Sequence, residues 1–343
     1  MIDALHSPTS LNATTPPGAS IERALLEQRV SEYQVVREIG RGAMGVVFLA
    51  RDVALHRLVA LKVLRHDLAS NEEQRERFRR EARVTARLSD GVVAVHGFGE
   101  RDDLVFIVME FVRGTPLSER LRHEPRLSVD ETRAILTTLA RTLDHAHSRG
   151  VVHRDLKPEN IILEQGSERP LLTDFGVALT PSSDPMPFEQ GGPRAFGTPQ
   201  FMSPEQAAGE TTVDGRSDIY SLGVLGYLLL TGELPFDGDS YAAIAAKQIA
   251  EPHVPLLSRR SDLPATLVLA IEKCLQKEPK DRWKSARDLV EVLEMGSNRS
   301  SMAALVTRLG RFAALLAVAI GLSYGPSKAA VEPQMAHKGV LGG

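Results

Sequence analysis

The stretch from His153 to Asn160 constrains the fold of this chain more than any other part of the sequence, because it places three chemically different side chains within six residues. Asp155 offers a carboxylate that can orient a hydroxyl group, Lys157 an ammonium group for a phosphate, and Asn160 an amide oxygen for a metal ion. A second carboxylate suited to a metal follows at Asp174, in the triplet Asp-Phe-Gly. We expect a fold that brings these two short segments together.

Length and composition indicate an ordinary globular protein. The 343 residues are enough for one large domain or two lobes with separate cores, and 43% hydrophobic with 25% charged residues argues against disorder. A formal net charge of −3 gives no reason to expect nucleic acid as a partner. The single cysteine, Cys274, excludes an internal disulfide and fits a reducing compartment. We expect it to be a buried core residue rather than a reactive thiol.

The pattern of apolar residues changes near residue 114. Before it, short runs rich in β-branched residues predict strands, and one charged amphipathic block predicts a helix. The expected strands are 33–39, 46–50, 58–64, 92–97 and 104–109, and the expected helix is 71–88. After it, helical periodicity dominates, with expected helices at 128–148, 217–231, 240–250, 263–276 and 285–295. Residues 1–32 are predicted to be a flexible leader with a short helix of no evident function at 21–27.

The combination of motifs resembles one family. His153 to Asn160, followed by Asp174-Phe175-Gly176, is similar to the catalytic loop and metal loop of protein kinases. Over residues 33–295 the chain resembles the eukaryotic-like (Hanks-type) bacterial serine/threonine protein kinases. The resemblance implies an α+β, two-lobed protein kinase fold. Its small β-rich N-lobe (33–110) would carry one regulatory helix, and its larger C-lobe (114–295) would be helical. The cofactors implied are ATP and Mg²⁺, or Mn²⁺ in its place.

A glycine-rich segment and a lysine are the parts expected to bind phosphate. Residues 40–47 fit the pattern G-x-G-x-x-G-x-V, and predicted strands flank it on both sides, whereas a dinucleotide-binding glycine loop opens a helix. By resemblance, Lys62 contacts the α- and β-phosphates and is held by Glu81, with Glu72, Glu73 and Glu76 as alternative partners. The residues expected to surround the nucleotide are Ile39, Gly40, Arg41, Gly42, Ala43, Met44, Gly45, Val46, Val47, Ala60, Lys62, Glu110 and Val112. The last two would use backbone groups at a hinge between the lobes.

The resemblance also assigns the catalytic roles. Asp155 would accept the proton of the substrate hydroxyl, and Lys157 would neutralise charge on the phosphoryl group. Asn160 and Asp174 would bind the metal. Lys62, Glu81 and Thr198 would complete the catalytic set.

Two further segments, Lys157-Pro158-Glu159 and 197–206, favour serine and threonine over tyrosine as acceptors. Thr198 would bond the catalytic aspartate and lysine. Glu205 is expected to pair with Arg282, and Asp218 to brace the catalytic loop.

Three features depart from the family pattern or stay open. Ser203 stands where the family motif A-P-E has alanine, and the short turn 89–91 leaves the exit of the preceding helix undefined. The guanidinium group of Arg154, next to Asp155, is expected to need a negative charge that neutralises it. Phosphorylation within 180–183 or the carboxylate of Glu189 would supply it.

Beyond Met295 we expect a linker (296–311), an apolar segment (312–325) and a short tail (326–343). The segment's 14 residues would rise about 21 Å as a helix, less than the ~30 Å apolar core of a bilayer. Snorkelling of Arg308 and Arg311 would lengthen the usable span and place the kinase part in the cytoplasm. The segment is therefore predicted to span the membrane once, with an interfacial or a soluble amphipathic helix as the alternatives. No cleaved signal peptide is expected at the N-terminus.

The expected activity is transfer of phosphate from ATP to serine or threonine hydroxyls of proteins, with autophosphorylation through a kinase dimer. A pseudokinase that only binds nucleotide is disfavoured, because every catalytic position carries the expected residue. A small-molecule kinase is disfavoured by 197–206, which in the family forms a platform for peptides.

Overall fold

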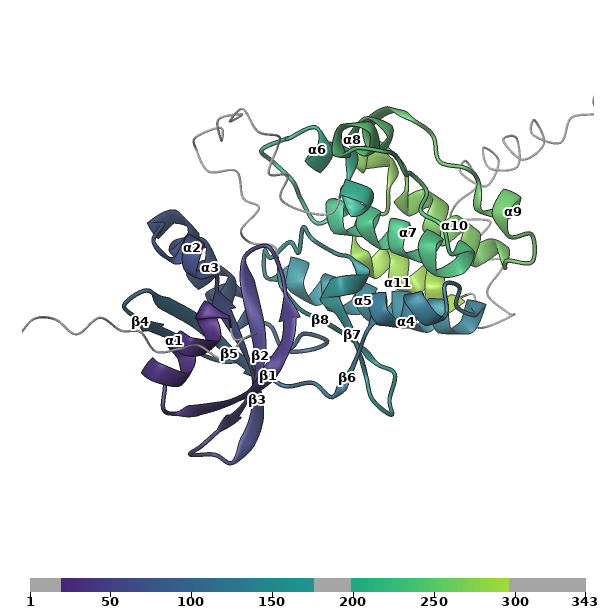
Figure 1. The fold of residues 1–343 in the computed structure, drawn as a ribbon. Coiled ribbons are helices and arrows are strands. Elements are labelled where there is room, and N and C mark those ends of the chain that lie inside the picture. Colours follow the sequence, from purple (N-terminus) through teal and green to yellow (C-terminus); the bar gives the residue numbers. More distant parts are fainter. Residues whose placement is uncertain (1–19, 176–198, 296–343) are drawn as a thin grey trace, which may run out of the picture. The chain divides into compact units, whose positions relative to one another are not determined.

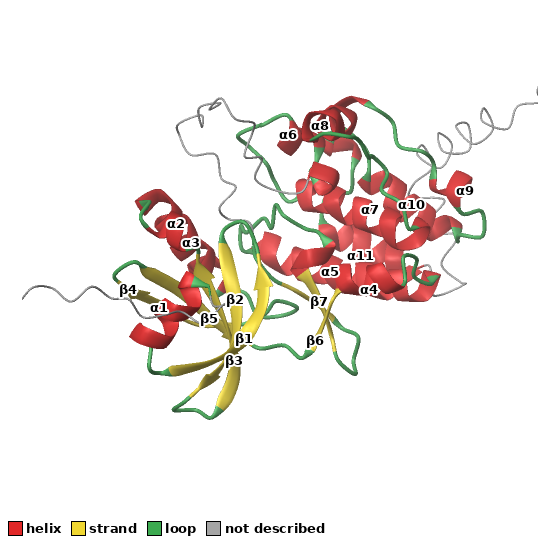
Figure 2. Cartoon of the chain, in the orientation of Figure 1, coloured by secondary structure: helices red, strands yellow, loops and turns green. Residues whose placement is uncertain are grey.

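A computed structural model describes residues 20–175 and 199–295 of the chain. Figure 1 shows a strand-rich part followed along the chain by a helical part. In Figure 2 the strands gather in the first part, and helices dominate after β6. This agrees with the α+β, two-lobed architecture expected from the sequence.

The first part is built on a five-stranded antiparallel sheet in the order β1-β2-β3-β5-β4. Its strands are β1 (Tyr33–Arg41), β2 (Gly45–Asp52), β3 (Arg57–Leu64), β4 (Val95–Arg101) and β5 (Leu104–Glu110). All five lie where the apolar pattern predicted strands, except that β4 begins at Val95 rather than Val92. The reason is that Val92 and Val93 pair with Leu172 of the second part instead of joining the sheet.

One face of this sheet is covered by helix α1 (Ile21–Arg29). The helix begins after Ser20, and the side chain of Ser20 accepts a hydrogen bond from the backbone N–H of Arg23. Leu26 and Val30 are each 1% exposed. They share a buried cluster with residues that alternate along three strands, namely Val46, Phe48, Ala50, Val59, Leu61, Val63, Leu104, Phe106 and Val108. The short helix expected at 21–27 is present, but the prediction of a flexible leader is wrong from Ile21 onward, because this helix packs on the sheet. Residues 1–19 lie outside the described part.

The opposite face is covered by α2 (His66–Ala69) and α3 (Glu72–Thr85). Successive residues of a strand point to opposite faces. Val105 and Ile107 of β5 therefore leave the α1 side and pack with Phe78 and Ala82 of α3. The same alternation along β3 puts Lys62 on the α3 side, between Leu61 and Val63, which face α1.

The second part is mostly helical. Its helices are α4 (Leu117–His123), α5 (Val129–Ser148), α6 (Pro204–Ala207), α7 (Arg216–Thr231), α8 (Tyr241–Ala250), α9 (Leu256–Arg259), α10 (Ala265–Cys274) and α11 (Ala286–Met295). Ser128 caps α5 in a capping box with Glu131, and Gly150 follows the helix in a left-handed conformation. α7 is buried along nearly its whole length and forms the centre of this part.

Cys274 is buried, as expected. No described helix combines the length and apolar content needed to cross a membrane.

A small sheet of β6 (Gly114–Pro116), β7 (Ile161–Glu164) and β8 (Pro170–Leu172) joins the two parts. Leu172 donates its N–H to the carbonyl of Gly91 at 2.8 Å and accepts one from Val93 at 2.9 Å. Gly91 has φ +76°. A Cβ there would lie 1.9 Å from Oγ1 of Thr142 on α5. The short turn at 89–91 thus brings the exit of α3 into direct contact with α5, which only glycine allows.

Candidate active site

Lys62 connects three elements of the structure. Its Nζ lies 2.6 Å from Oε1 of Glu81 on α3 and 2.7 Å from Oδ1 of Asp174, which follows β8. Lys62 and Glu81 are only 7% and 6% exposed, whereas the Asp174 side chain is 38% exposed. One buried ammonium group therefore holds a carboxylate from each lobe.

The charges of these three groups shift one another's pKa. Burial alone would lower the pKa of Lys62, but the neighbouring carboxylates outweigh it and raise the pKa above its ordinary value. Burial raises the pKa of Glu81 even though Lys62 opposes the shift. Burial would raise the pKa of Asp174 as well, yet Lys62 brings it below the usual range. Asp174 is thus kept ionised, which a metal ligand requires.

The other carboxylates of α3 lie elsewhere. Glu72, Glu73 and Glu76 form ion pairs with arginines of the same helix, and their side chains are 76%, 48% and 42% exposed. Among the four carboxylates considered as partners of Lys62, only Glu81 is buried against it.

The catalytic-loop side chains contact one another. Nζ of Lys157 lies 2.8 Å and 3.0 Å from the two carboxylate oxygens of Asp155. Nδ2 of Asn160 donates to the backbone carbonyl of Asp155 at 2.8 Å and to its Oδ2 at 3.0 Å. Both of these bonds use the amide nitrogen of Asn160, so its amide oxygen is the atom suited to a metal. The carboxylate of Asp155 is held between one cation and one amide.

Asp218 on α7 fixes the backbone that leads into this loop. Its carboxylate accepts the N–H groups of His153 and Arg154, each at 2.8 Å, and contacts Nε2 of His147 at 2.7 Å. Burial would raise the pKa of Asp218. The hydrogen bond to His147 and the charge of that ring are the largest of the effects that outweigh burial and hold the pKa below its usual range. The ring of His153 stacks at an angle on Phe175, with centroids 4.6 Å apart. This places His153 and Phe175 in packing roles and links the catalytic loop to the segment of Asp174.

The glycine-rich segment forms the turn between β1 and β2. Ile39 to Arg41 end β1, Gly42 to Met44 make the turn, and 45–47 begin β2. A Cβ on Gly45 would meet the carbonyl of Val63 at 2.6 Å, so this position requires glycine. An added Cβ on Gly40 or Gly42 would make only ordinary contacts. The N–H of Gly42 donates to the carbonyl of Gly45 at 2.8 Å, which closes the turn.

The predicted hinge lies where β5 ends. Ala60 of β3 pairs with Met109, one residue before Glu110. The N–H of Glu110 donates to the carbonyl of Ala94 at 2.9 Å, so only its carbonyl can serve the expected contact with adenine. Val112 follows two residues later, between β5 and β6.

The donor set fits magnesium. The described residues contain no group of three or more His, Cys, Asp and Glu that could hold a metal alone. Mg²⁺ is commonly held by one or two protein oxygens together with phosphates and water. The carboxylate of Asp174 and the amide oxygen of Asn160 are hard ligands of the kind it prefers.

The segment after residue 198 is anchored to the helical part. Arg282 makes a bidentate pair with Glu205 at 2.7 Å for each bond, and both side chains are buried. Gln248, fully buried on α8, donates to the backbone carbonyls of Pro199 and Gln200. Thr198, the 180–183 cluster and Glu189 lie outside the described residues.

Sequence reasoning missed several polar residues of this region. Four of them contact the catalytic loop, Asp218 or the segment 199–206, namely His147, Gln206, Ser217 and Gln248. Each finds its partner far along the chain, so no local spacing marks it.

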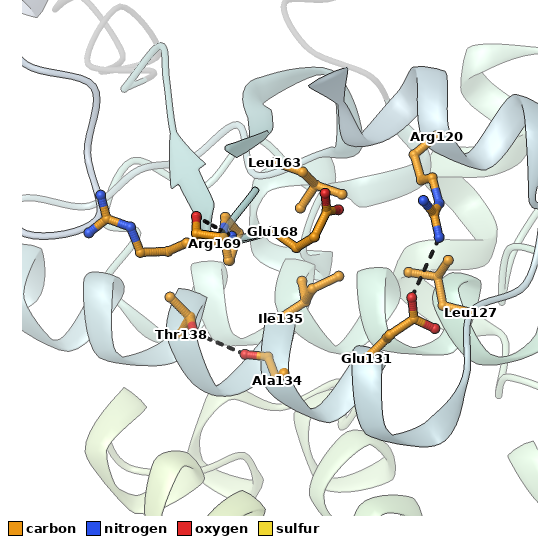
Figure 3. Close-up of a pocket in the computed structure, with 11 residues that line it drawn as sticks. Arg120, Leu127, Glu131, Ala134, Ile135, Thr138, Leu163, Glu168 and Arg169 are labelled. Atoms are coloured by element: carbon orange, nitrogen blue, oxygen red, sulfur yellow. Dashed lines mark hydrogen bonds and ion pairs between the residues drawn. The ribbon is translucent and has the colours of Figure 1, made fainter. Parts of the chain in front are cut away.

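A separate pocket lies on the helical part, between α4, α5 and the turn that joins β7 to β8. In Figure 3 the side chain of Ile135 forms part of its wall, Glu168 borders it, and Arg120 faces Glu131 across one end. No residue predicted for the active site lines this pocket. The chemistry described above is therefore located elsewhere, at the junction of the lobes.

Comparisons with known proteins agree with this geometry. A sequence profile described as the protein kinase domain matches residues 33–293. A serine/threonine-protein kinase of Myxococcus xanthus, pkn3, is 39% identical over 88% of this chain and 56% of its own length. PrkC of Bacillus subtilis, also a serine/threonine-protein kinase, is 38% identical over 77% of this chain and 40% of its own length. The chain thus spans about half of these relatives or less. The crystal structure of the PknI kinase domain of Mycobacterium tuberculosis superimposes with a TM-score of 0.61 and 34% identity, covering 78% of this chain and 96% of that chain.

Proposed function

The chain belongs to the protein kinase family, and on that premise we propose that it transfers the γ-phosphate of ATP to serine and threonine hydroxyls of proteins. The observation that carries the proposal is the arrangement of Lys62, Glu81 and Asp174 beside an intact catalytic loop. The buried pair of Lys62 and Glu81 is the one that protein kinases need in place for phosphate transfer. A nucleotide-binding scaffold without activity would not need Asp155, Lys157 and Asn160 in mutual contact.

Each side chain has a defined task in this reaction. The glycine-rich turn and Lys62 bind the triphosphate, and Asp155 accepts the hydrogen bond of the acceptor hydroxyl. The hydroxyl oxygen forms a bond to the γ-phosphorus as the bond to the bridging oxygen of ADP breaks, and the proton ends on Asp155. Lys157 neutralises charge on the moving phosphoryl group. Mg²⁺, held by Asn160 and Asp174, would neutralise charge on the phosphates.

Serine and threonine are favoured as acceptors by two observations. Lys157-Pro158-Glu159 is the form of the loop found in serine/threonine kinases, and both relatives named above carry that activity in their names. The proposed hydrogen bonds of Thr198 to Asp155 and Lys157 are also a feature of serine/threonine kinases.

The test is transfer of radiolabelled phosphate from Mg-ATP to a generic basic protein. We expect label on wild type, none on Asp155→Asn, and wild-type labelling by Asp239→Asn, which changes an exposed aspartate. Acid hydrolysis should release phosphoserine and phosphothreonine. Equal labelling by wild type and Asp155→Asn would refute the proposal, and phosphotyrosine alone would refute the acceptor class.

We also propose that residues 312–325 associate the chain with the cytoplasmic membrane and that two chains phosphorylate each other. The support is the apolar run 312–325 preceded by Arg308 and Arg311, and the need of Arg154 for a neutralising charge. Cell fractionation with and without residues 304–343 tests the first. Mass spectrometry of 174–205 after incubation with Mg-ATP tests the second. Identical fractionation, or an active chain without modification there, would contradict them.

A further inference from the structure

The residue before the catalytic aspartate is held at both of its backbone groups. Arg154 has φ +66°, a left-handed conformation that residues other than glycine rarely adopt. Its N–H donates to Oδ1 of Asp218 at 2.8 Å, and its carbonyl accepts a hydrogen bond from Nε2 of Gln206, also at 2.8 Å. The first contact comes from α7 and the second from α6. The unusual turn that presents Asp155 is thus clamped from two helices.

The orientation of the Gln206 amide is fixed by its other partners. Its Oε1 accepts the hydroxyl of Ser217 at 2.7 Å and the backbone N–H of Ser203 at 3.1 Å. A flipped amide would place nitrogen against the backbone N–H of Ser203 and oxygen against the carbonyl of Arg154. The amide therefore has one favourable orientation, with its donor toward Arg154.

Ser203 and Ser217 complete this chain of hydrogen bonds. Both are fully buried, and their hydroxyl oxygens lie 2.9 Å apart. Because Ser217 gives its proton to Gln206, it accepts the proton of Ser203. Ser203 occupies the position of the alanine in the family motif A-P-E, so its hydroxyl supplies a bond that alanine lacks.

We propose that Gln206 is a positioning residue for the kinase activity, with Ser203 and Ser217 as its supports. By holding the carbonyl of Arg154, it keeps the left-handed turn in the form that directs Asp155 toward the acceptor hydroxyl. α6 lies at the end of 197–206, the segment expected to receive the protein substrate. The three residues therefore connect that segment to the catalytic loop. This inference rests on the proposed phosphate-transfer activity.

The first test is Gln206→Met, which keeps the length of the side chain and removes its donor and acceptor. The loss of one neutral hydrogen bond should lower kcat about tenfold. The KM for ATP should stay unchanged, since the hydrogen-bond partners of Gln206 are Ser203, Arg154 and Ser217, none of which is expected to bind the nucleotide. Gln276→Met is the matched control, because Nε2 of Gln276 also donates to a backbone carbonyl, that of Glu272, outside the active site. Its kcat should equal that of wild type.

Thermal unfolding accompanies the measurement. A Gln206→Met protein with wild-type kcat would overturn the inference. So would a loss of kcat that only follows the unfolded fraction at the assay temperature, or that comes with an equal rise in KM. An inactive wild type would instead refute the proposed function.

The second test is a double-mutant cycle that asks whether Ser203 acts through Gln206. Ser203→Ala should lower kcat about threefold in the wild-type background, as expected for a supporting bond within a network. In the Gln206→Met background the same change should have no further effect. Independent, multiplicative losses would show that Ser203 acts by another route and would overturn its assigned role.

Discussion

Glu81 of α3 lies 2.6 Å from Lys62 of β3, and both side chains are more than nine-tenths buried. Removing one partner of such a pair leaves an uncompensated charge away from water, which costs far more than an exposed pair contributes. The position of α3 and the state of the phosphate-binding lysine are therefore linked. A movement of α3 away from the sheet would leave Lys62 with Asp174 as its only partner among these residues.

We predict graded losses of activity when this pair is changed. Lys62→Met removes the ammonium group from the phosphate site and should lower kcat about 100-fold. Glu81→Gln keeps the shape but not the charge, so Lys62 keeps Asp174 and the loss should be smaller. Steady-state kinetics with Mg-ATP measures both. Glu76→Gln, an exposed position on the same helix, should behave as wild type, and a comparable loss there would contradict the role of Glu81.

The stability that Asp218 contributes by holding the catalytic loop should depend on pH. Asp218→Asn replaces an acceptor of two backbone N–H groups with an amide that can accept only at its oxygen, which should cost about 1–3 kcal/mol. The pKa of Asp218 lies below its ordinary value in the folded protein. Its ionised form therefore contributes stability above the unfolded pKa of about 3.9, and this contribution is lost as the pH falls through the folded value.

The measurement is urea unfolding of wild type and Asp218→Asn between pH 7 and pH 3. The wild-type advantage should be constant from pH 7 to about pH 5 and then shrink toward acid. An advantage that does not change over this range would show that ionisation of Asp218 is not what holds the loop.

The packing of α1 should be measurable as stability. Leu26 is 1% exposed between α1 and the sheet, whereas Ile21 on the same helix is 60% exposed. Leu26→Ala should lower the free energy of unfolding by about 2–5 kcal/mol, and Ile21→Ala by less than about 0.5 kcal/mol. Denaturant unfolding gives both values. Similar small losses in the two variants would mean that α1 does not contribute to the core.

The contact between Gly91 and Thr142 can be separated from backbone strain. Gly91→Ala introduces both a left-handed alanine, at about 1–2 kcal/mol, and a clash with Oγ1 of Thr142. Gly150→Ala is the matched control, because Gly150 has φ +73° and nothing within 4 Å of an added Cβ. We expect Gly91→Ala to be the more destabilising, and Thr142→Ala to recover part of the difference. Equal melting temperatures for the two alanine variants would exclude the clash.

The sequence predicted what depends on local pattern. Short runs rich in β-branched residues placed the strands, helical periodicity placed the start of α5, and the resemblance to the kinase motifs led from Lys62 to Glu81. These signals are short-range, or are read against a motif whose spacing is fixed by the fold. The start of β4 was misplaced because Val92 and Val93 look like strand residues, and they do pair, but with Leu172.

Long-range polar contacts could not be predicted in the same way. Gln206 and Arg154 are separated by 52 positions, and a glutamine on a short helix usually faces solvent. Its role becomes visible only when α6 and the catalytic loop are seen together. The packing of α1 was missed for a related reason, because its apolar residues contact a sheet face that is formed by strands later in the chain.

The N-terminal boundary of the family match differs from the N-terminal boundary of the hydrophobic core. The match to the protein kinase profile starts at Tyr33, whereas the hydrophobic core takes its first side chains from Leu25 and Leu26 of α1, seven or eight residues earlier. A recombinant fragment trimmed to the family border would uncover an apolar surface over Val46, Phe48 and Leu61. Poor solubility of such a fragment would then report a missing wall of the domain, and should not be read as a defect of the enzyme.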